Sequence, residues 1–540
     1  MKVLLIQPPV QDFYDTDIRL QPLGLCFLKA ALTEHCPDVE VIVRDFHHGC
    51  GRQTIAIPQE FHYLKEYYKE HNGTPFSSFN HYYHFGLPFE EIAEKVRSEK
   101  PDLVGISSLF APYYREVLRC AEAIKKRWGT IIVVGGGQAT CSPSLMLENP
   151  AIDYIVRGEG EKPLVELAKA LMSGGSEATI AGLGYKREGR IHLNPVGENF
   201  PFNTLPCPDF ADLSAEKYLY RKKPMAFVQT SRGCPHRCSF CSVHQIFGRS
   251  YRRRNPEHII AEMEHRYQDG VRVFDFEDDN LTLKRSHILD LCNRISEKFT
   301  GGDITLLAMN GISYNNLDPE ILQHMKKAGF SRLNLALVSS ERQVLQGVNR
   351  PHCPEKLQEV VHAAFSLGFD LEVHQIIGLP NESLASMANS MAFLGRLPVL
   401  IGVSIFYLTP GTDIARQFPA MEGKDIFMSR STAMARQSEE CGRDDLFTLF
   451  TTARIINFLK GIEIEGAEIS LEELLHRKNK EKRIRSGIEI LTRLLTEKKF
   501  YTAHKDMYAQ QPGFRYSTFE KVWENKDSII TQNGKKISLR

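Results

Sequence analysis

Thr230-Ser-Arg-Gly-Cys-Pro-His-Arg-Cys-Ser-Phe-Cys241 holds three cysteines, Cys234, Cys238 and Cys241, at C-x3-C-x2-C spacing. The stretch reads as a loop between an expected strand at 224–229 and an expected helix at 256–267. Iron–sulfur clusters are normally held by four cysteine thiolates. Three cysteines therefore leave one iron of a [4Fe–4S] cluster without a protein ligand, and an open iron is a place for chemistry.

Two structural alternatives for the three cysteines are weaker. A zinc site usually pairs two C-x2-C units or adds a pair of histidines, and the nearby His236 and His244 do not complete such a pattern. A structural disulfide conflicts with the cysteine usage of the whole chain. Twelve cysteines in 540 residues, scattered outside this stretch, are typical of a reducing compartment.

The composition is that of an ordinary soluble protein, with 42% hydrophobic and 25% charged residues. A formal net charge of +1 gives no global attraction to nucleic acid or anionic lipid. No apolar run reaches the length of a membrane span, and the apolar run at the N-terminus is too short for a signal peptide. We therefore expect a cytoplasmic enzyme of two to four domains, with no nucleic-acid partner and no membrane span.

The first third of the chain alternates short apolar strands with helices. Strands are expected at 3–6, 39–45, 102–107, 130–135 and 152–156, and helices at 22–35, 113–127 and 161–172. This alternation predicts a doubly wound parallel sheet, whose ligands bind outside the carboxyl ends of the strands. Three loops stand out there: Gln7-Pro8-Pro9, Ser107-Ser108 and Gly135-Gly136-Gly137-Gln138. Taken alone, the glycines fit a tight turn equally well.

The central part restarts the alternation and predicts a partial (β/α)6 barrel. Strands are expected at 224–229, 271–276, 303–308, 331–338, 369–377 and 401–407, and helices near 256–268, 285–299, 318–328, 355–367 and 383–395. Chemistry in such barrels lies at the carboxyl ends of the strands, which is where the cysteine loop follows the first strand.

The remaining segments set the domain boundaries. Residues 46–88 are irregular and rich in aromatic side chains, so they either cap a pocket or wrap the sheet. Residues 180–195 read as a hairpin and 203–210 as a proline-rich linker. We expect a mainly helical C-terminal region on the substrate side, with partial disorder after 511. The expected divisions are 1–178, 179–222, 223–415 and 416–540.

With Phe240 directly before the last cysteine, the cysteine stretch is similar to the signature of radical S-adenosylmethionine (SAM) enzymes. Gln7-Pro-Pro9, Pro22-Leu-Gly-Leu25, Gly105-Ile-Ser-Ser108, Gly135-Gly-Gly137 and Arg157-Gly-Glu-Gly-Glu161, in this order, resemble the cobalamin-binding domain that precedes many radical SAM domains. The resemblance, closest to the class B methyltransferases, implies a [4Fe–4S] cluster on Cys234, Cys238 and Cys241, with SAM on the open iron and cobalamin in the N-terminal domain. An electron from an external flavodoxin- or ferredoxin-like donor then cleaves SAM to a 5′-deoxyadenosyl radical.

The resemblance also implies cofactor contacts beyond the cluster ligands. For SAM these are Phe240, Asp278, Asp279, Ser339 and Gly378; for cobalamin they are Gln7, Ser107, Ser108, Gly135, Gly136 and Gly137. The acidic run 277–280 fits the ammonium and ribose of SAM, or the substrate, or alternatively caps the next helix. Val338 stands where the family often has a glutamate. The loop after the first strand lacks the histidine of D-x-H-x-x-G, and we interpret His47 and His48 as surface or linker residues rather than ligands.

The reaction implied is C-methylation of an unactivated carbon of a small-molecule or natural-product substrate. No catalytic side chain is assigned beyond the cluster ligands. Three alternatives remain open. A cobalamin-dependent cyclisation or rearrangement would omit the methyl transfer. An RNA-directed methylthiotransferase would need a second cysteine cluster, and a cobalamin sensor would not need an open iron.

Overall fold

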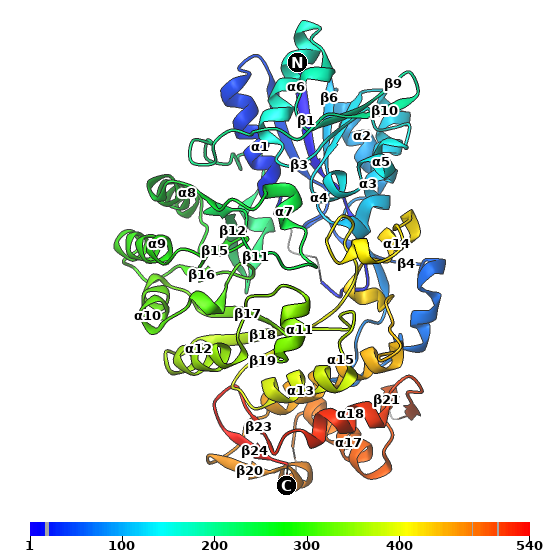
Figure 1. Cartoon of the computed structure of the whole chain (residues 1–540), viewed down its shortest axis with the longest axis vertical. Helices are drawn as coiled ribbons and strands as arrows, with labels where there is room; N and C mark the ends of the chain where they lie inside the picture. Colours follow the sequence, from blue (N-terminus) through cyan, green and yellow to red (C-terminus); the bar gives the residue numbers. More distant parts are fainter. Residues whose placement is uncertain (17–20, 478, 505–506, 540) are drawn as a thin grey trace.

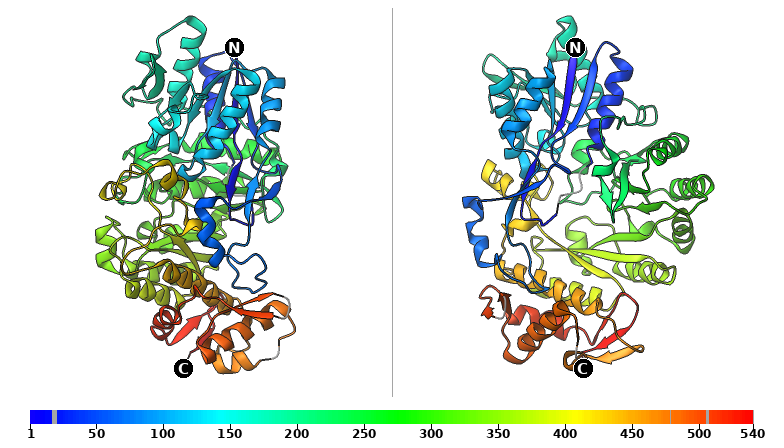
Figure 2. Two further views of the ribbon diagram at one scale, coloured as in Figure 1. Left: turned by 90° about the vertical axis from the view of Figure 1, so that its right-hand side faces the viewer. Right: turned by 180° about the vertical axis from the view of Figure 1, so that it is seen from behind.

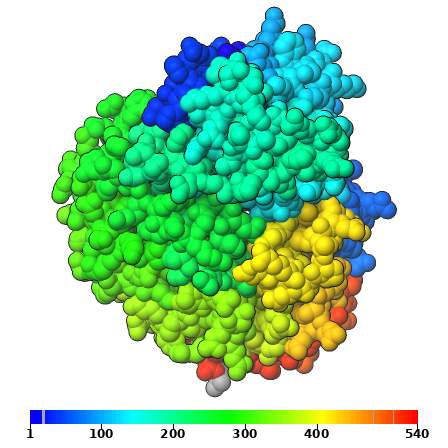
Figure 3. All heavy atoms as spheres, turned by 45° about the horizontal axis from the view of Figure 1, so that its top comes forward, coloured from blue at the N-terminus to red at the C-terminus, as the bar shows by residue number. Residues whose placement is uncertain are grey.

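The computed structural model describes residues 1–16, 21–477, 479–504 and 507–539. Three parts follow one another along the chain (Figure 1). An N-terminal α/β part lies at one end, a curved central part carries its helices on the outside, and the C-terminal part lies at the opposite end. Figure 3 shows one face on which the N-terminal part, the central part and the segment around residue 420 meet.

A seven-stranded sheet in the order β10-β9-β8-β7-β6-β1-β3 forms the core of the N-terminal part. Its strands are β1 (Lys2–Gln7), β3 (Glu40–Asp45), β6 (Leu103–Ser107), β7 (Ile131–Gly135) and β8 (Tyr154–Val156), all parallel, with the hairpin β9 (Leu183–Arg187) and β10 (Arg190–Leu193) at one edge. The predicted hairpin is therefore confirmed.

Helices cover both faces of this sheet, because successive strand residues point to opposite sides. Leu4 and Ile6 pack with α2 (Phe89–Glu99) and α3 (Tyr114–Trp128). Val3 and Leu5 pack with α1 (Leu23–His35) and α6 (Glu161–Ser173). The predicted doubly wound sheet is confirmed, although α2 was not predicted.

The central part has the six predicted βα units. The strands are β12 (Lys223–Val228), β15 (Val273–Phe276), β16 (Thr305–Leu307), β17 (Arg332–Val338), β18 (Asp370–Ile377) and β19 (Leu400–Ile405). The helices between them include α8 (Pro256–Gln268), α9 (Arg285–Lys298), α10 (Pro319–Ala328), α12 (Pro354–Ser366) and α13 (Leu384–Gly395). The strands form two sheets, β11-β12-β15-β16 and β17-β18-β19, with β11 (Leu219–Tyr220) at one edge. A backbone bridge between Leu306 and Phe330 connects them.

The C-terminal part is mainly helical, as predicted, and packs its last residues into the core. Its longer helices are α15 (Arg443–Lys460), α17 (Lys482–Glu497) and α18 (Tyr516–Glu524), and a small sheet combines β20 (Glu468–Ser470), β23 (Ser528–Ile530) and β24 (Lys536–Ser538). Phe519, Val522 and Ile529 are fully buried, so the expected disorder after residue 511 is wrong for the described residues. In the described part of the chain no helix is both long and apolar enough to span a membrane.

The aromatic segment 46–88 fastens the N-terminal part to the C-terminal part. It contributes β4 (Arg52–Ile55) and β5 (Tyr82–Phe85), which form a small sheet with β2 (Val10–Asp12). The hydroxyls of Tyr63, Tyr67 and Tyr68 donate hydrogen bonds at 2.6 Å to Ala433 O, Asp444 Oδ1 and Thr432 O, respectively. Figure 2 shows this blue segment beside the orange helices of the C-terminal part. Its role is therefore neither of the two that were predicted, capping a pocket or wrapping the sheet, taken alone, because it also links the two ends of the chain.

His47 and His48 follow β3 and lie in this packed region. His47 is fully buried, with Nδ1 3.2 Å from Phe85 O, and the His48 ring stacks on Tyr218 at 5.0 Å between ring centroids. The predicted surface position is therefore wrong for His47. Its burial follows from the return of β5 across the end of β3.

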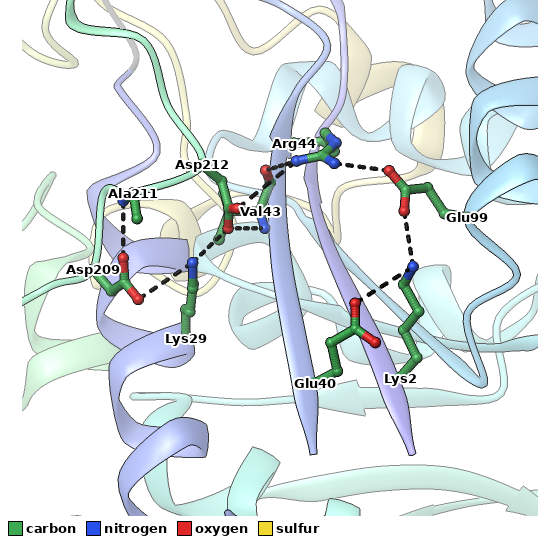
Figure 4. A network of polar contacts seen from close by, with 9 residues as sticks. All are labelled: Lys2, Lys29, Glu40, Val43, Arg44, Glu99, Asp209, Ala211 and Asp212. Carbon is green, nitrogen blue, oxygen red and sulfur yellow. Dashed lines mark hydrogen bonds and ion pairs between the residues drawn. The ribbon is translucent and has the colours of Figure 1, made fainter.

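The proline-rich linker is held against the N-terminal part by charged groups (Figure 4). The Lys29 ammonium on α1 lies 2.6 Å from Asp212 and 3.2 Å from Asp209. Asp212 also accepts a hydrogen bond from the Val43 N–H at 2.9 Å. These contacts fix the linker that leads into β12, and therefore the position of the cysteine loop relative to the sheet.

The buried Lys526 should make the stability of the C-terminal part depend on pH. Its side chain is buried, its ammonium donates to Val522 O at 3.0 Å, and burial lowers its pKa from 10.5 to about 7. Between pH ~7 and pH ~10.5, Lys526 is protonated in the unfolded chain and neutral in the folded chain. The free energy of unfolding therefore rises with pH in this range. We expect the melting temperature to rise from pH ~7 to pH ~9, and Lys526→Met to remove part of the rise. Equal pH slopes for the two proteins would contradict this expectation.

Candidate active site

The three cysteines lie on the loop that leads from β12 to α7 (Val243–Phe247). Cys238 is buried, and Cys234 and Cys241 are half-buried. Among the described residues no group of three or more His, Cys, Asp or Glu side chains could hold a single metal ion. An iron–sulfur cluster does not require such convergence, since each thiolate binds a different iron. Asn280 Nδ2 lies 3.7 Å from the Cys234 sulfur and Arg350 Nη1 lies 3.7 Å from the Cys238 sulfur, and donors of this kind tune cluster potentials.

Two carboxylates at the end of β15 hold the start of this loop. Asp278 is 2% exposed and accepts hydrogen bonds from the N–H of Thr230 at 3.2 Å and from its hydroxyl at 2.8 Å. Burial raises the pKa of Asp278 to about 6, although these hydrogen bonds lower it. Asp279 accepts from the Gly233 N–H at 2.7 Å. The acidic run thus braces the cysteine loop instead of capping α9.

The other three residues assigned to SAM lie elsewhere. Ser339 is buried and donates to Glu382 at 2.9 Å. Gly378 has φ +82°, and a Cβ there would lie 2.9 Å from Leu446. Phe240 packs on an apolar cluster that includes Val338, whose φ of +71° is strained for a β-branched residue. Ser339, Gly378 and Phe240 do not line the cavity described next, so their contact with SAM stays a prediction.

A cavity of about 970 Å³ lies between the N-terminal sheet and the central part. Residues at the carboxyl ends of β1, β6, β7 and β8 line one side, and residues that follow β12, β15, β16 and β19 line the other, including Asp278 and Asp279. Doubly wound sheets and (β/α) barrels both bind their ligands at the carboxyl ends of the strands. One cavity therefore joins the predicted cobalamin loops to Asp278 and Asp279, two of the five residues predicted to contact SAM.

Most residues assigned to cobalamin line this cavity, namely Gln7, Ser107, Gly135, Gly136 and Gly137, whereas Ser108 is buried and does not line it. Gly136 has φ +110°, and a Cβ there would lie 2.7 Å from Ser108 O, so the backbone at this point has no room for a side chain. Gln138 also lines the cavity and is 1% exposed, yet neither of its amide atoms has a hydrogen-bond partner among the described residues. Such orphaned polar atoms need a bound group, and they fit a large ligand rich in amides.

Arg232 joins the cysteine loop to the N-terminal part. Its Nη1 lies 2.8 Å from Glu159 Oε2 and 2.8 Å from Glu161 Oε1, and Arg252 Nη2 lies 2.6 Å from Glu159 Oε1. The side chains of Arg232 and both glutamates are at most 6% exposed, and the guanidinium lies 4.4 Å from the Phe202 ring centroid. We call this group the Arg232 clamp. It ties the loop of the expected cluster ligands to the loop after β8.

A second buried ion pair, between Asp12 and Arg430, also lines the cavity. Arg430 Nη1 lies 3.2 Å from Asp12 Oδ2, which also accepts a hydrogen bond from the Tyr113 hydroxyl at 2.8 Å. The Thr432 hydroxyl donates to Asp12 Oδ1 at 2.7 Å. Sequence reasoning missed this pair and the Arg232 clamp, because their partners are 418 and 73 positions apart. The pattern Arg157-Gly-Glu-Gly-Glu161 indicated that the two glutamates matter, but it did not indicate that Arg232 is their partner.

Comparison with known proteins identifies the two halves of this site. The model of the radical SAM superfamily matches residues 228–394, and that of the B12 binding domain matches residues 74–168. An uncharacterized methyltransferase of Pyrococcus horikoshii is 30% identical over 318 residues, which are 58% of this chain and 68% of that protein. The chain belongs to the cobalamin-binding radical SAM enzymes. In the radical SAM domain the cofactors are a [4Fe–4S] cluster and SAM, and in the B12 domain the cofactor is cobalamin.

Two further proteins resemble this radical SAM enzyme over most of its length. Cytidylyl-2-hydroxyethylphosphonate methyltransferase of Streptomyces wedmorensis is 24% identical over 416 residues, covering 70% of this chain and 73% of that protein. The structure of the radical SAM methyltransferase TsrM from Kitasatospora setae, with cobalamin and a [4Fe–4S] cluster bound, superposes with a TM-score of 0.60 at 20% identity. The match covers 77% of this chain and 78% of that one. The second likeness concerns the fold.

Proposed function

We propose that this enzyme methylates an unactivated carbon of a small-molecule substrate. The observation that carries the proposal is the shared cavity, which Gly136 and Gln138 line from the cobalamin side and Asp278 and Asp279 line from the SAM side. Methyl transfer through cobalamin and hydrogen abstraction by a SAM-derived radical must occur within reach of one substrate carbon. A single chamber between the two domains supports that requirement.

The roles of the chain's own residues follow from their positions. We assign Cys234, Cys238 and Cys241 as cluster ligands. Asp279, which lies beside the cysteine loop, is suited to the ammonium of SAM. When bound, the cluster and SAM supply a 5′-deoxyadenosyl radical after uptake of one electron, and cobalamin supplies the methyl group of a second SAM. An external flavodoxin- or ferredoxin-like protein is the proposed electron donor.

We assign one role to each of the four segments that the sequence predicts. Residues 1–178 are proposed to bind cobalamin and 223–415 to bind the cluster and SAM, while 179–222 connect them and 416–540 close the substrate side. The Asp12–Arg430 pair supports the last assignment, because it brings the C-terminal part to the edge of the cavity. The paired charges of the Arg232 clamp hold the two cofactor domains in a fixed relation.

Methyl-labelled SAM tests the reaction class. The reconstituted enzyme is incubated anaerobically with reductant, labelled SAM and a pool of small molecules, and the mixture is searched for a labelled product. We expect the label in one product, together with 5′-deoxyadenosine and S-adenosylhomocysteine in equal amounts. 5′-Deoxyadenosine with a converted but unlabelled substrate would replace methylation by cyclisation or rearrangement.

Gly136→Ala tests the cobalamin assignment. The new Cβ would lie 2.7 Å from Ser108 O, so the loop must move and distort the cavity wall at a cost of about 1–3 kcal/mol. We expect the affinity for hydroxocobalamin to fall by about tenfold or more. The measured quantity is the cobalamin that stays bound after desalting. Gly174→Ala is the matched control, because Gly174 also has positive φ but an added Cβ meets nothing within 4 Å. Equal cobalamin retention by both variants would contradict the assignment.

A further inference from the structure

The cavity has no free positive charge among the described residues that line it. Its cationic side chains are Arg232 and Arg430, and both are held by buried carboxylates. Arg232 is committed to Glu159 and Glu161, and Arg430 to Asp12. Neither arginine can turn toward an anionic ligand without leaving a buried carboxylate unpaired, which is strongly unfavourable.

Carboxylates outnumber these two cations on the cavity wall. The lining contains Asp12, Glu159, Glu161, Glu277, Asp278 and Asp279. The sulfonium and ammonium of SAM are compatible with such surroundings, and the side chains on the corrin ring of cobalamin are neutral amides. A phosphate or carboxylate on the substrate would instead meet like charge in a space of reduced dielectric constant, where repulsion exceeds its value in water. The described residues of the wall therefore select against anionic substrates.

Large apolar side chains face the same space. Tyr14, Leu109, Phe110 and Tyr407 are 37%, 47%, 44% and 39% exposed, respectively, and all four line the cavity. Burial raises the pKa of both phenols, and the nearby Tyr407 raises that of Tyr14 further, so both side chains stay neutral. Aromatic and aliphatic walls with few oriented polar groups are typical of sites for apolar ligands.

We propose that the substrate is an uncharged, largely apolar ring compound, and that Tyr14 and Tyr407 contact it. This inference rests on the proposed function and specifies its substrate class. It separates this enzyme from its Streptomyces relative, which is named for a phosphonate. The two tyrosines come from the loop after β2 and from the segment after β19, and both lie near Asp12, so the proposed substrate position is beside the Asp12–Arg430 pair.

Three probes that share a naphthalene ring and differ in the charge of the attached polar group test the proposal. 2-Naphthylmethanol, 2-naphthylmethylammonium and 2-naphthoate are equilibrated by dialysis with the cobalamin-loaded enzyme, and the bound fraction of each is measured. We expect the alcohol to bind at least about tenfold more tightly than the carboxylate, because like charges in contact cost several kcal/mol. The ammonium should also bind more tightly than the carboxylate. Naphthoate affinity equal to or above that of the alcohol would overturn the proposal.

Variants locate the binding and its electrostatic cause. Tyr14→Ala and Tyr407→Ala should each weaken binding of the alcohol by about tenfold, since an aromatic wall is lost, whereas Met507→Ala, an exposed apolar residue outside the cavity, should not. Thr409→Lys adds a cation to the cavity wall and should raise naphthoate affinity. Alcohol binding insensitive to both tyrosines would also overturn the proposal. Probe binding needs no turnover, so its failure is distinct from a failure to form 5′-deoxyadenosine.

Discussion

Replacement of Cys234, Cys238 and Cys241 together by alanine is expected to abolish iron binding and 5′-deoxyadenosine formation. The three thiols are the only cysteines that the loop after β12 offers, and a cluster without protein thiolates has no attachment to the chain. The fold should survive, because only Cys238 of the three is buried. Iron and sulfide analysis after anaerobic reconstitution, with the visible absorption of the cluster, gives a readout independent of turnover.

Cys207→Ala is the control for this prediction. Cys207 is exposed and lies on the linker, so its loss should leave the iron content unchanged. Reconstituted triple variant that still binds four irons per chain, or still cleaves SAM, would refute the ligand assignment. Iron lost equally from the Cys207 variant would point to general damage instead.

Arg232→Gln is expected to destabilise the contact between the two cofactor domains. The substitution leaves Glu159 and Glu161 buried with only Arg252 beside Glu159. Removal of one partner from a buried ion pair costs about 3–5 kcal/mol, because the remaining charge is uncompensated. We expect a lower melting temperature and a smaller amount of cobalamin retained after desalting.

Two further variants isolate the cause. Arg237→Gln changes an exposed arginine of the same loop and should leave the melting temperature unchanged. Glu159→Gln and Glu161→Gln added to Arg232→Gln remove the unpaired charges and should restore much of the lost stability, which a mutant cycle measures as a coupling free energy. A coupling near zero would show that the Arg232 clamp does not hold the domains.

Local patterns in the sequence sufficed to predict the N-terminal sheet, the central strands and most of the helices, although not α2. The apolar run at 102–107, for example, became the strand β6, because burial on both faces leaves a continuous apolar signature. The stretch 369–377 became β18, whose buried apolar residues alternate with partly exposed ones. The structure of the residues after 511 was harder to predict. Phe519, Val522 and Ile529 alternate with charged residues, and their burial depends on α13 and α15, which lie far earlier in the chain.

The site was predicted only where local spacing carries chemistry. The cysteine trio and the glycines of 135–137 are visible as motifs, whereas Arg232 with Glu159, or Asp12 with Arg430, become partners only through the fold. Asp278 illustrates the limit. Its acidic surroundings suggested a ligand contact, but its side chain also holds Thr230 through hydrogen bonds that no sequence pattern announces.

The central claim is that one chain brings a radical SAM cluster and cobalamin to one cavity. The most direct measurement reconstitutes the protein anaerobically with iron, sulfide and hydroxocobalamin, desalts it, and determines iron and cobalt per chain before SAM and reductant are added. We predict one cobalt, a full [4Fe–4S] complement and 5′-deoxyadenosine. Iron and 5′-deoxyadenosine without cobalt would contradict the claim, because the N-terminal sheet would then serve another purpose.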